Sequence, residues 1–231
     1  MYLLAIDTST NSAAVAVAGP EGALLVAAPG SGQRHGRQLI PTIASLLSEA
    51  GLALADLDGF AVGLGPGSYT GLRIGLTAVK TLAYVTGKPV VGLNSLEVIA
   101  QNAPGEALSV SVVADAQRGD LYTLDLARSE PLGRLIASDS TRIEPRTAWE
   151  SRLGKGTWVL GPGLDRLAGP LPDTLDVAPA AQNQPDARRL ADLALRVWRS
   201  GLRHDAWSLE PLYLRRSAAE DQWERKAAPS A

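Results

Sequence analysis

The chain contains no cysteine, and this absence excludes several kinds of chemistry at once. It also has only two histidines among its 231 residues, His35 and His204, which stand far apart. Without cysteine there can be no disulfide, no thiolate nucleophile and no cysteine-based zinc site. A histidine pair is equally poorly supplied, because Leu39 stands four residues after His35 where a second ligand would be sought. We therefore expect no metal site.

Charge and long apolar runs are also sparse. Charged residues make up 20% of the chain and the formal net charge is -2, which gives no general argument for binding nucleic acid or an anionic membrane. The apolar start, residues 1–6, stops at Asp7 and has no basic flank, so it does not resemble a signal peptide. No apolar run approaches the ~18 residues that span a bilayer. We expect a cytoplasmic protein with no membrane contact.

The first hundred residues predict a mixed sheet flanked by helices. Three short apolar segments, 2–6, 13–18 and 24–28, are separated by turn-forming residues, which favours an antiparallel meander. Strands at 60–64 and 90–93 then alternate with helices, which adds parallel strands to the same sheet.

Two apolar helices are predicted, at residues 38–50 and 71–86. The first has apolar residues on one face at helical spacing. The second is apolar on most sides, and Arg73 and Lys80 are its only charges. Such a helix is either buried between the sheet and a neighbouring element, or forms an interface.

A glycine-rich turn at residues 65–71 joins a predicted strand to the second helix. Such a turn exposes backbone N–H groups at a helix N-terminus, where the helix dipole favours anions. The Walker pattern is absent, because no Gly-Lys-Ser/Thr ends the loop. The alternative is a tight connection that needs glycine for a left-handed backbone or a close approach.

The pattern of apolar strand, aspartate, turn and strand occurs twice, at Asp7 and at Asp115. It restarts near residue 103, so we predict a first lobe at 1–103 and a smaller second lobe with a charged tail at 104–231. One recurrence suggests a structural duplication. Paired carboxylates in one cleft could hold a metal-bound phosphate or act as acid and base, whereas each alone could simply start a turn.

Several stretches of the sequence carry a resemblance to a known family. They are LLAIDTSTNSAAVAV, RHGRQLIPTI, GLGPGSYTGLRIGLTAVKTLAYVTGKPVVGLNSLEVIA, VVADAQRGDLY and the tail LEPLYLRR. Together they resemble the TsaB (YeaZ) family of tRNA threonylcarbamoyladenosine biosynthesis proteins. The resemblance is strong over residues 1–125 and thin over 126–205.

The resemblance implies an α/β fold of the actin, sugar kinase and Hsp70-like (ASKHA) class, with two related lobes, each a mixed sheet with flanking helices. Asp7 and Asp115 would then lie at corresponding hairpins that face the cleft between the lobes. The turn Gly161-Pro162-Gly163 would lie where active members of the class hold adenosine. The candidate nucleotide- or anion-binding residues are Asp7, Thr8, Ser9, Gly65, Pro66, Gly67, Ser68, Asp115, Gly161 and Gly163.

The resemblance also implies a non-catalytic scaffold. The chain would hold a TsaD-like catalytic subunit through its two first-lobe helices, and a TsaE-like ATPase would join them. The assembly would transfer threonylcarbamoyl to the adenosine 3′ of the tRNA anticodon. This chain would need no cofactor, although ATP or ADP could bind at the partner interface. Alone it would form a homodimer. The candidate interface residues are Leu39, Ile43, Leu46, Leu47, Leu72, Leu76, Val79 and Leu82.

Three alternatives remain at this point. One is a nucleotide-dependent phosphotransferase that uses Asp7 and Asp115. Another is direct tRNA binding by basic residues of the tail, Arg215, Arg216, Arg225 and Lys226, with tRNA otherwise reached only through the complex. The third is an inactive peptidase-like protein, since metal, nucleophile and base are all missing. If the scaffold hypothesis is right, Leu76→Glu or Val79→Glu should abolish partner binding while the fold survives.

Overall fold

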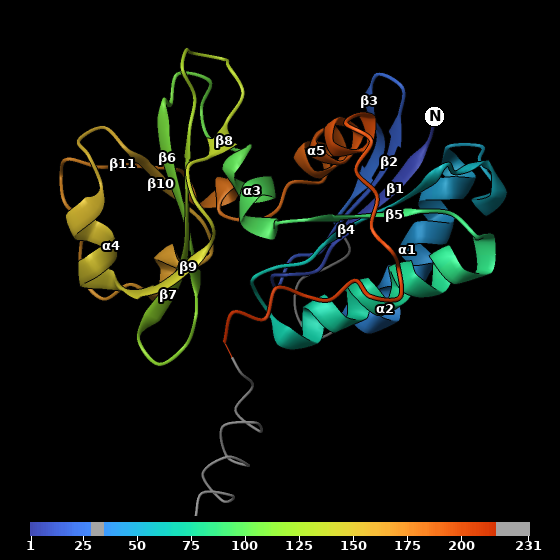
Figure 1. The fold of residues 1–231 in the computed structure, drawn as a ribbon, viewed down its shortest axis with the longest axis horizontal. Coiled ribbons are helices and arrows are strands. Elements are labelled where there is room, and N and C mark those ends of the chain that lie inside the picture. The colour runs from blue at the N-terminus through green and yellow to red at the C-terminus, as the bar shows by residue number, and fades with distance from the viewer. Residues whose placement is uncertain (29–34, 216–231) are drawn as a thin grey trace, which may run out of the picture.

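The computed structural model describes residues 1–28 and 35–215, which form two lobes side by side (Figure 1). Arg216, Arg225 and Lys226 of the predicted basic tail lie outside the described residues. Within the described part of the chain, no helix is both long and apolar enough to cross a membrane.

The first lobe is built on a five-stranded sheet with the order β3-β2-β1-β4-β5. Its first three strands, β1 (Leu3–Asp7), β2 (Ala14–Gly19) and β3 (Gly22–Ala27), form the predicted antiparallel meander. The other two, β4 (Gly59–Gly63) and β5 (Val90–Leu93), extend the sheet in parallel from β1.

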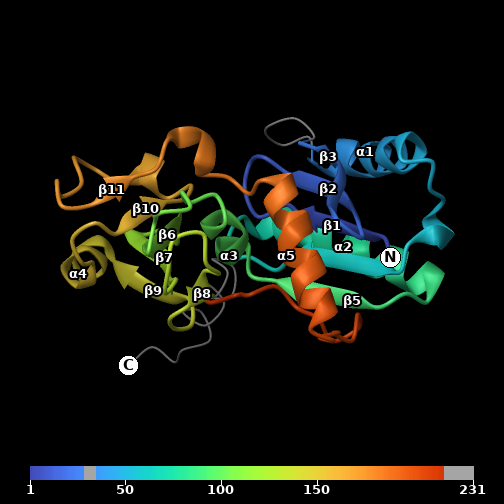
Figure 2. The same cartoon turned by 90° about the horizontal axis from the view of Figure 1, so that it is seen from above.

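Helices cover both faces of this sheet (Figure 2). On one face lie α1 (His35–Glu49) and α2 (Tyr69–Thr86), and on the other lies α5 (Ala187–Arg199). Each face of the sheet has its own hydrophobic core, and alternate residues of β1 point into one or the other. Leu4 packs in the core beneath α1 and α2, and Leu3 packs in the core beneath α5. This double coverage explains why β1 is apolar throughout instead of alternating with polar residues. A short 3-10 turn, η1 (Leu54–Asp56), precedes β4.

The second lobe repeats the path of the first. In its sheet β6 (Ser109–Asp115) pairs with antiparallel β7 (Asp120–Ala127) on one side and parallel β10 (Trp158–Leu160) on the other. Beyond β10 lies β11 (Asp176–Val177), and β7 pairs with both β8 (Ile136–Ala137) and β9 (Arg142–Pro145). The remaining elements are α3 (Ser95–Ala100), α4 (Arg146–Arg152), η2 (Leu164–Arg166) and η3 (Ala180–Gln182).

The two sheets therefore share one topology, with β6, β7, β10 and β11 matching β1, β2, β4 and β5. Asp7 ends β1 and Asp115 ends β6, so the aspartates occupy equivalent positions. This confirms the predicted α/β class with two related lobes of the ASKHA type.

The position of α5 corrects the predicted lobe boundary. Although residues 187–199 follow the second sheet in sequence, the apolar stripe of α5, which includes Leu190 and Ala194, packs against Leu3 and Ala5 of β1. The chain thus returns to the first lobe, where α5 buries the apolar face of the sheet that α1 and α2 leave open. The predicted second lobe, 104–231, wrongly included this helix.

The candidate interface residues on α1 and α2 are also placed differently from the prediction. All but Leu82 are at least nine-tenths buried in the core beneath the first sheet, and Leu82 is half-buried against it. The buried residues are Leu39, Ile43, Leu46, Leu47, Leu72, Leu76 and Val79. Their apolar stripe packs in the core of this chain, so it does not face a partner. A glutamate there would be buried without a partner, so Leu76→Glu or Val79→Glu would disrupt the fold itself.

We predict that Leu76→Ala lowers the free energy of unfolding by about 2–5 kcal/mol, because Leu76 is only 6% exposed and its removal leaves a cavity under the sheet. Chemical denaturation measures this change. The neighbouring Thr77→Ala, at an exposed position of the same helix, is the matched control and should change stability by no more than about 0.5 kcal/mol. Equal effects of the two substitutions would contradict the placement of Leu76 in the core.

Candidate functional site

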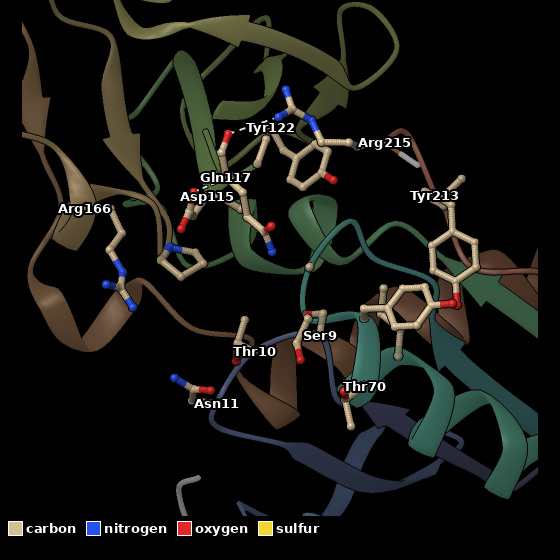
Figure 3. Close-up of a pocket in the computed structure, with 18 of the residues that line it drawn as sticks. Ser9, Thr10, Asn11, Thr70, Asp115, Gln117, Tyr122, Arg166, Tyr213 and Arg215 are labelled. Carbon is tan, nitrogen blue, oxygen red and sulfur yellow. Dashed lines mark hydrogen bonds between the residues drawn. The ribbon is translucent and has the colours of Figure 1, made fainter. Parts of the chain in front are cut away.

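A cavity of about 720 Å³ lies between the two lobes (Figure 3). The first lobe contributes the β1–β2 turn, with Ser9 and Thr10, and the N-terminal end of α2, with Thr70. The second lobe contributes Asp115 from the end of β6 and Arg166 from η2. Equivalent strand ends of the two related sheets thus face one another across a polar cleft.

The glycine-rich turn before α2 crosses directly over the β1–β2 turn. Gly65 has a left-handed backbone with φ of 91°, and side chains at Gly67 and Gly71 would clash with the carbonyl oxygens of Ser9 and Thr8. Hydrogen bonds fix the crossing: Ser68 N–H donates to Ser9 O (2.7 Å), and Thr8 Oγ1 donates to Gly71 O (2.7 Å). The packing interpretation therefore accounts for the glycines in this turn.

Asp7 does not face the cavity, which corrects the prediction that it does. Its side chain is fully buried beneath the crossing, against Gly63. Its Oδ1 accepts a hydrogen bond from Ser9 N–H (2.8 Å), and its Oδ2 has no hydrogen-bond partner. Burial raises the pKa of Asp7, and the hydrogen bond from the Ser9 N–H only partly opposes this effect.

Asp115 is exposed and lines the cavity as predicted. Its Oδ1 accepts the Gln117 N–H (2.7 Å), which begins a turn in which Gln117, Arg118 and Gly119 all have positive φ. The structure therefore brings only one of the two predicted carboxylates into the cleft. The predicted pair, Asp7 and Asp115, is therefore not brought together around one bound phosphate.

The second glycine turn packs as closely as the first. Gly161 has φ of 121° and lies against Val113 of β6, while Gly163 N–H donates to Val113 O (3.0 Å). Gly161 N–H donates a hydrogen bond to Asn183 Oδ1 (2.9 Å). Of this turn, Pro162 lines the cavity.

Several residues of the cleft were missed by the sequence interpretation. Tyr122 of β7 lines the cavity, and burial raises its pKa. Arg215 and Tyr213 reach the same cavity from the far end of the chain (Figure 3). The LEPLYLRR stretch marked these two residues as a family feature, but the sequence does not show where that stretch lies in the folded protein. Two buried polar atoms in the lining have no hydrogen-bond partner, Ser9 Oγ and Gln184 Oε1.

A second feature is the solvent-facing side of α1 and α2, here called the outer face. Its exposed large apolar residues are Ile40, which is 53% exposed, and Val85, which is 71% exposed. The α2 part carries no charge, because Arg73 and Lys80 both turn to the C-terminal segment. The outer face consists of Ile40, Ala44, Ile74, Thr77, Ala78, Thr81 and Val85.

The fold and the cleft define a two-lobed protein of the ASKHA class, and comparisons with known proteins narrow this further. Residues 28–142 match the family model described as TsaD, tRNA N6-adenosine threonylcarbamoyltransferase. The chain is 29% identical to the tRNA threonylcarbamoyladenosine biosynthesis protein TsaB of Bacillus subtilis, over 96% of this chain and 98% of that protein. For the Escherichia coli TsaB the identity is 28%, over 95% and 96%.

Solved structures agree with these relatives. YeaZ from Pseudomonas aeruginosa superposes with a TM-score of 0.76 at 29% identity, covering 92% of this chain and 99% of that one. A structure described as similar to peptidase YeaZ, also from Pseudomonas aeruginosa, gives 0.77 at 29% identity, with 93% and 99% covered. The chain belongs to the TsaB (YeaZ) family.

The buried carboxyl of Asp7 gives a test by pH. Because its pKa is raised in the folded protein, the folded state binds a proton more tightly than the unfolded chain. The stability contributed by the protonated group is therefore lost as pH rises from the unfolded pKa through the folded one. Asp7→Asn stays neutral and can still accept the Ser9 N–H. We expect it to be more stable than the parent at neutral pH.

Thermal unfolding from about pH 4 to about pH 8 measures this difference, which should grow with pH and then level off. Asp115→Asn is the control, since it makes the same substitution at the exposed, equivalent strand end. If Asp7→Asn were less stable than the parent throughout, the buried group would be needed as a carboxylate and the interpretation would be wrong.

Proposed function

We propose that the protein is a non-catalytic subunit in the biosynthesis of threonylcarbamoyladenosine in tRNA. The observation that carries this proposal is its similarity to two TsaB proteins over almost the full length of both chains. The relatives are named for this pathway, and the TsaD-type model that matches residues 28–142 is named for its transferase. In this role the chain supports a TsaD-like subunit that transfers the threonylcarbamoyl group.

The state of the cleft supports a role without chemistry of its own. Asp7 is sealed beneath the glycine crossing, where it cannot reach a ligand in the cavity. Asp115 is present, but its Oδ1 already accepts from Gln117 N–H. The phosphotransferase hypothesis needed both carboxylates in one place, so it loses its main support.

The outer face is the surface we propose for the TsaD-like partner. It is formed by two adjacent helices, and α2 contributes small and apolar residues without charge, which suits helix packing against a second helix pair. An exposed apolar surface of this kind seldom stays uncovered. In the isolated protein two copies would pair through it as a homodimer. A TsaE-like ATPase would join the heterodimer, and tRNA would be reached through the assembled complex in the cytoplasm.

We predict that Ile40→Glu and Val85→Glu each weaken binding of the TsaD-like subunit from the same source by at least about tenfold, because a carboxylate would be buried against an apolar partner. Both positions are exposed, so thermal stability should stay near that of the parent. Analytical ultracentrifugation gives the affinity, and the same variants should shift the isolated protein from dimer to monomer.

The matched control is Val177→Glu, which places the same charge at a 51% exposed valine on β11, away from the outer face. A reconstituted modification assay then tests the function, with threonylcarbamoyladenosine in tRNA measured by mass spectrometry. Product should form with the parent and with Val177→Glu, and should fall for Ile40→Glu and Val85→Glu. Undiminished product without this chain would refute the proposed function.

A second candidate function is ATP or ADP binding without turnover, with the nucleotide placed where the cleft meets the partner. It is favoured by Ser9, Thr10 and Thr70, polar residues that line the cavity beside the N-terminus of α2. Calorimetry of the complex with ADP and magnesium should show binding that Ser9→Ala weakens. Ser12→Ala, in the same turn but outside the lining, should bind as the parent does. No heat of binding from the parent complex would reject this candidate.

A further inference from the structure

The segment that follows α5, residues 202–215, crosses the open edge of the first sheet and runs along α2 toward the second lobe (Figure 1). It is here called the strap. Backbone bonds fasten it to the first lobe: His204 N–H donates to Val90 O (2.8 Å), and Leu212 N–H donates to Leu64 O (2.8 Å). The Nδ1 of His204 also accepts from Gly92 N–H (3.1 Å). The strap is thus a fixed part of the first lobe.

Contacts along α2 hold the strap at both ends of the helix. Near its C-terminus, the rings of Tyr84 and Trp207 meet edge to face at 5.4 Å, and Lys80 Nζ donates to Trp207 O (3.0 Å). Near its N-terminus, Tyr213 lies 5.1 Å from the ring of Tyr69 and its hydroxyl accepts from Arg73 Nε (3.2 Å). Both charged residues of α2 therefore hold the strap.

The last described residue of the strap reaches the second lobe. Arg215 forms an ion pair with Asp120 at the start of β7, and its guanidinium also donates to Gln117 O (3.2 Å). The two charged side chains are only 20% and 32% exposed, so solvent weakens this pair less than a fully exposed one. Arg215 also lines the cavity between the lobes, as Figure 3 shows.

The chain itself crosses between the lobes elsewhere. One crossing runs from β5 through α3 to β6, and the other runs from β11 to α5. They are tied together where the side-chain amide of Asn102 donates to Gln182 O (2.9 Å) and Gln184 O (2.8 Å). In Figure 2 the second crossing and the strap lie on opposite sides of the molecule. The cleft thus has a covalent connection on one side and a noncovalent one on the other.

We propose that the strap is a latch between the lobes. It is anchored along α2, and its Arg215 binds Asp120 and the Gln117 carbonyl in the turn that leads into β7. The Arg215–Asp120 pair therefore limits how far the cleft opens. Because the strap lies beside α2, a partner on the outer face would stiffen the anchored end of the latch. Only this last link rests on the proposed function, since the latch belongs to the isolated chain.

The absence of cysteine makes the test direct. Cysteines introduced at Ser48 of α1 and Lys155 of the second lobe, both exposed, carry spin labels in the full chain. An excess of unlabelled protein suppresses signals between copies. Pulsed electron paramagnetic resonance should give a narrow distance distribution for the parent. Arg215→Gln and Asp120→Asn should each shift it to longer distances and broaden it, and Tyr213→Ala should do so to a smaller degree.

The control is Arg188→Gln, which removes one positive charge from an exposed site on α5 and should leave the distribution unchanged. The charge swap, Arg215→Glu with Asp120→Arg, should restore the narrow distribution. Parent-like distributions for both Arg215→Gln and Asp120→Asn would overturn the proposal, as would a swap that stays as open as the single variants. Because no partner is present, these outcomes are independent of the proposed function.

Discussion

The structure depends on one close contact, the crossing of the glycine-rich turn over the β1–β2 turn. A side chain at Gly63, Gly67, Gly71 or Gly75 would overlap Asp7, Ser9 or Thr8, so the crossing requires glycine at each place. The contact fixes where α2 begins, and hence the direction in which the helix runs. It also removes Asp7 from solvent. The position of α2, the shape of the cleft and the burial of a carboxyl thus have a common cause.

Much of the fold could be predicted from the sequence because it rests on local patterns. The meander of β1–β3 followed from turn residues between apolar segments, and the two apolar helices followed from their spacing. The repeated aspartate pattern predicted that the second lobe is a structural duplicate of the first, and the shared sheet topology confirms this. The return of α5 to the first sheet could not be predicted, because it depends on which face of a distant sheet lacks a cover.

The site was harder to predict for two physical reasons. An aspartate at a strand end can point into a cleft or under a neighbouring loop, and for Asp7 this depends on the close packing against Gly63 and on the crossing above it. The helix α2 is apolar on most sides, so one apolar stripe packs against the sheet and another faces solvent. The sequence pointed to the stripe of Leu76, which is buried, while Val85 lies on the exposed one. The cleft residues from the C-terminal segment depend on a contact between distant parts of the chain.

The helix α2 connects the three regions on which the proposals rest. Its N-terminal end lines the cleft, its solvent side is the outer face, and its remaining side holds the strap that ends on the second lobe. In the proposed function, a subunit without its own reaction would have to transmit the presence of one partner to another. We expect α2 to meet that need, because it lines the cleft, carries the outer face and contacts the strap, so a displacement at one of these contacts would change the free energy of the others. The glycines allow α2 to pack directly on the β1–β2 turn, and this close packing fixes the N-terminal end of the helix at the cleft.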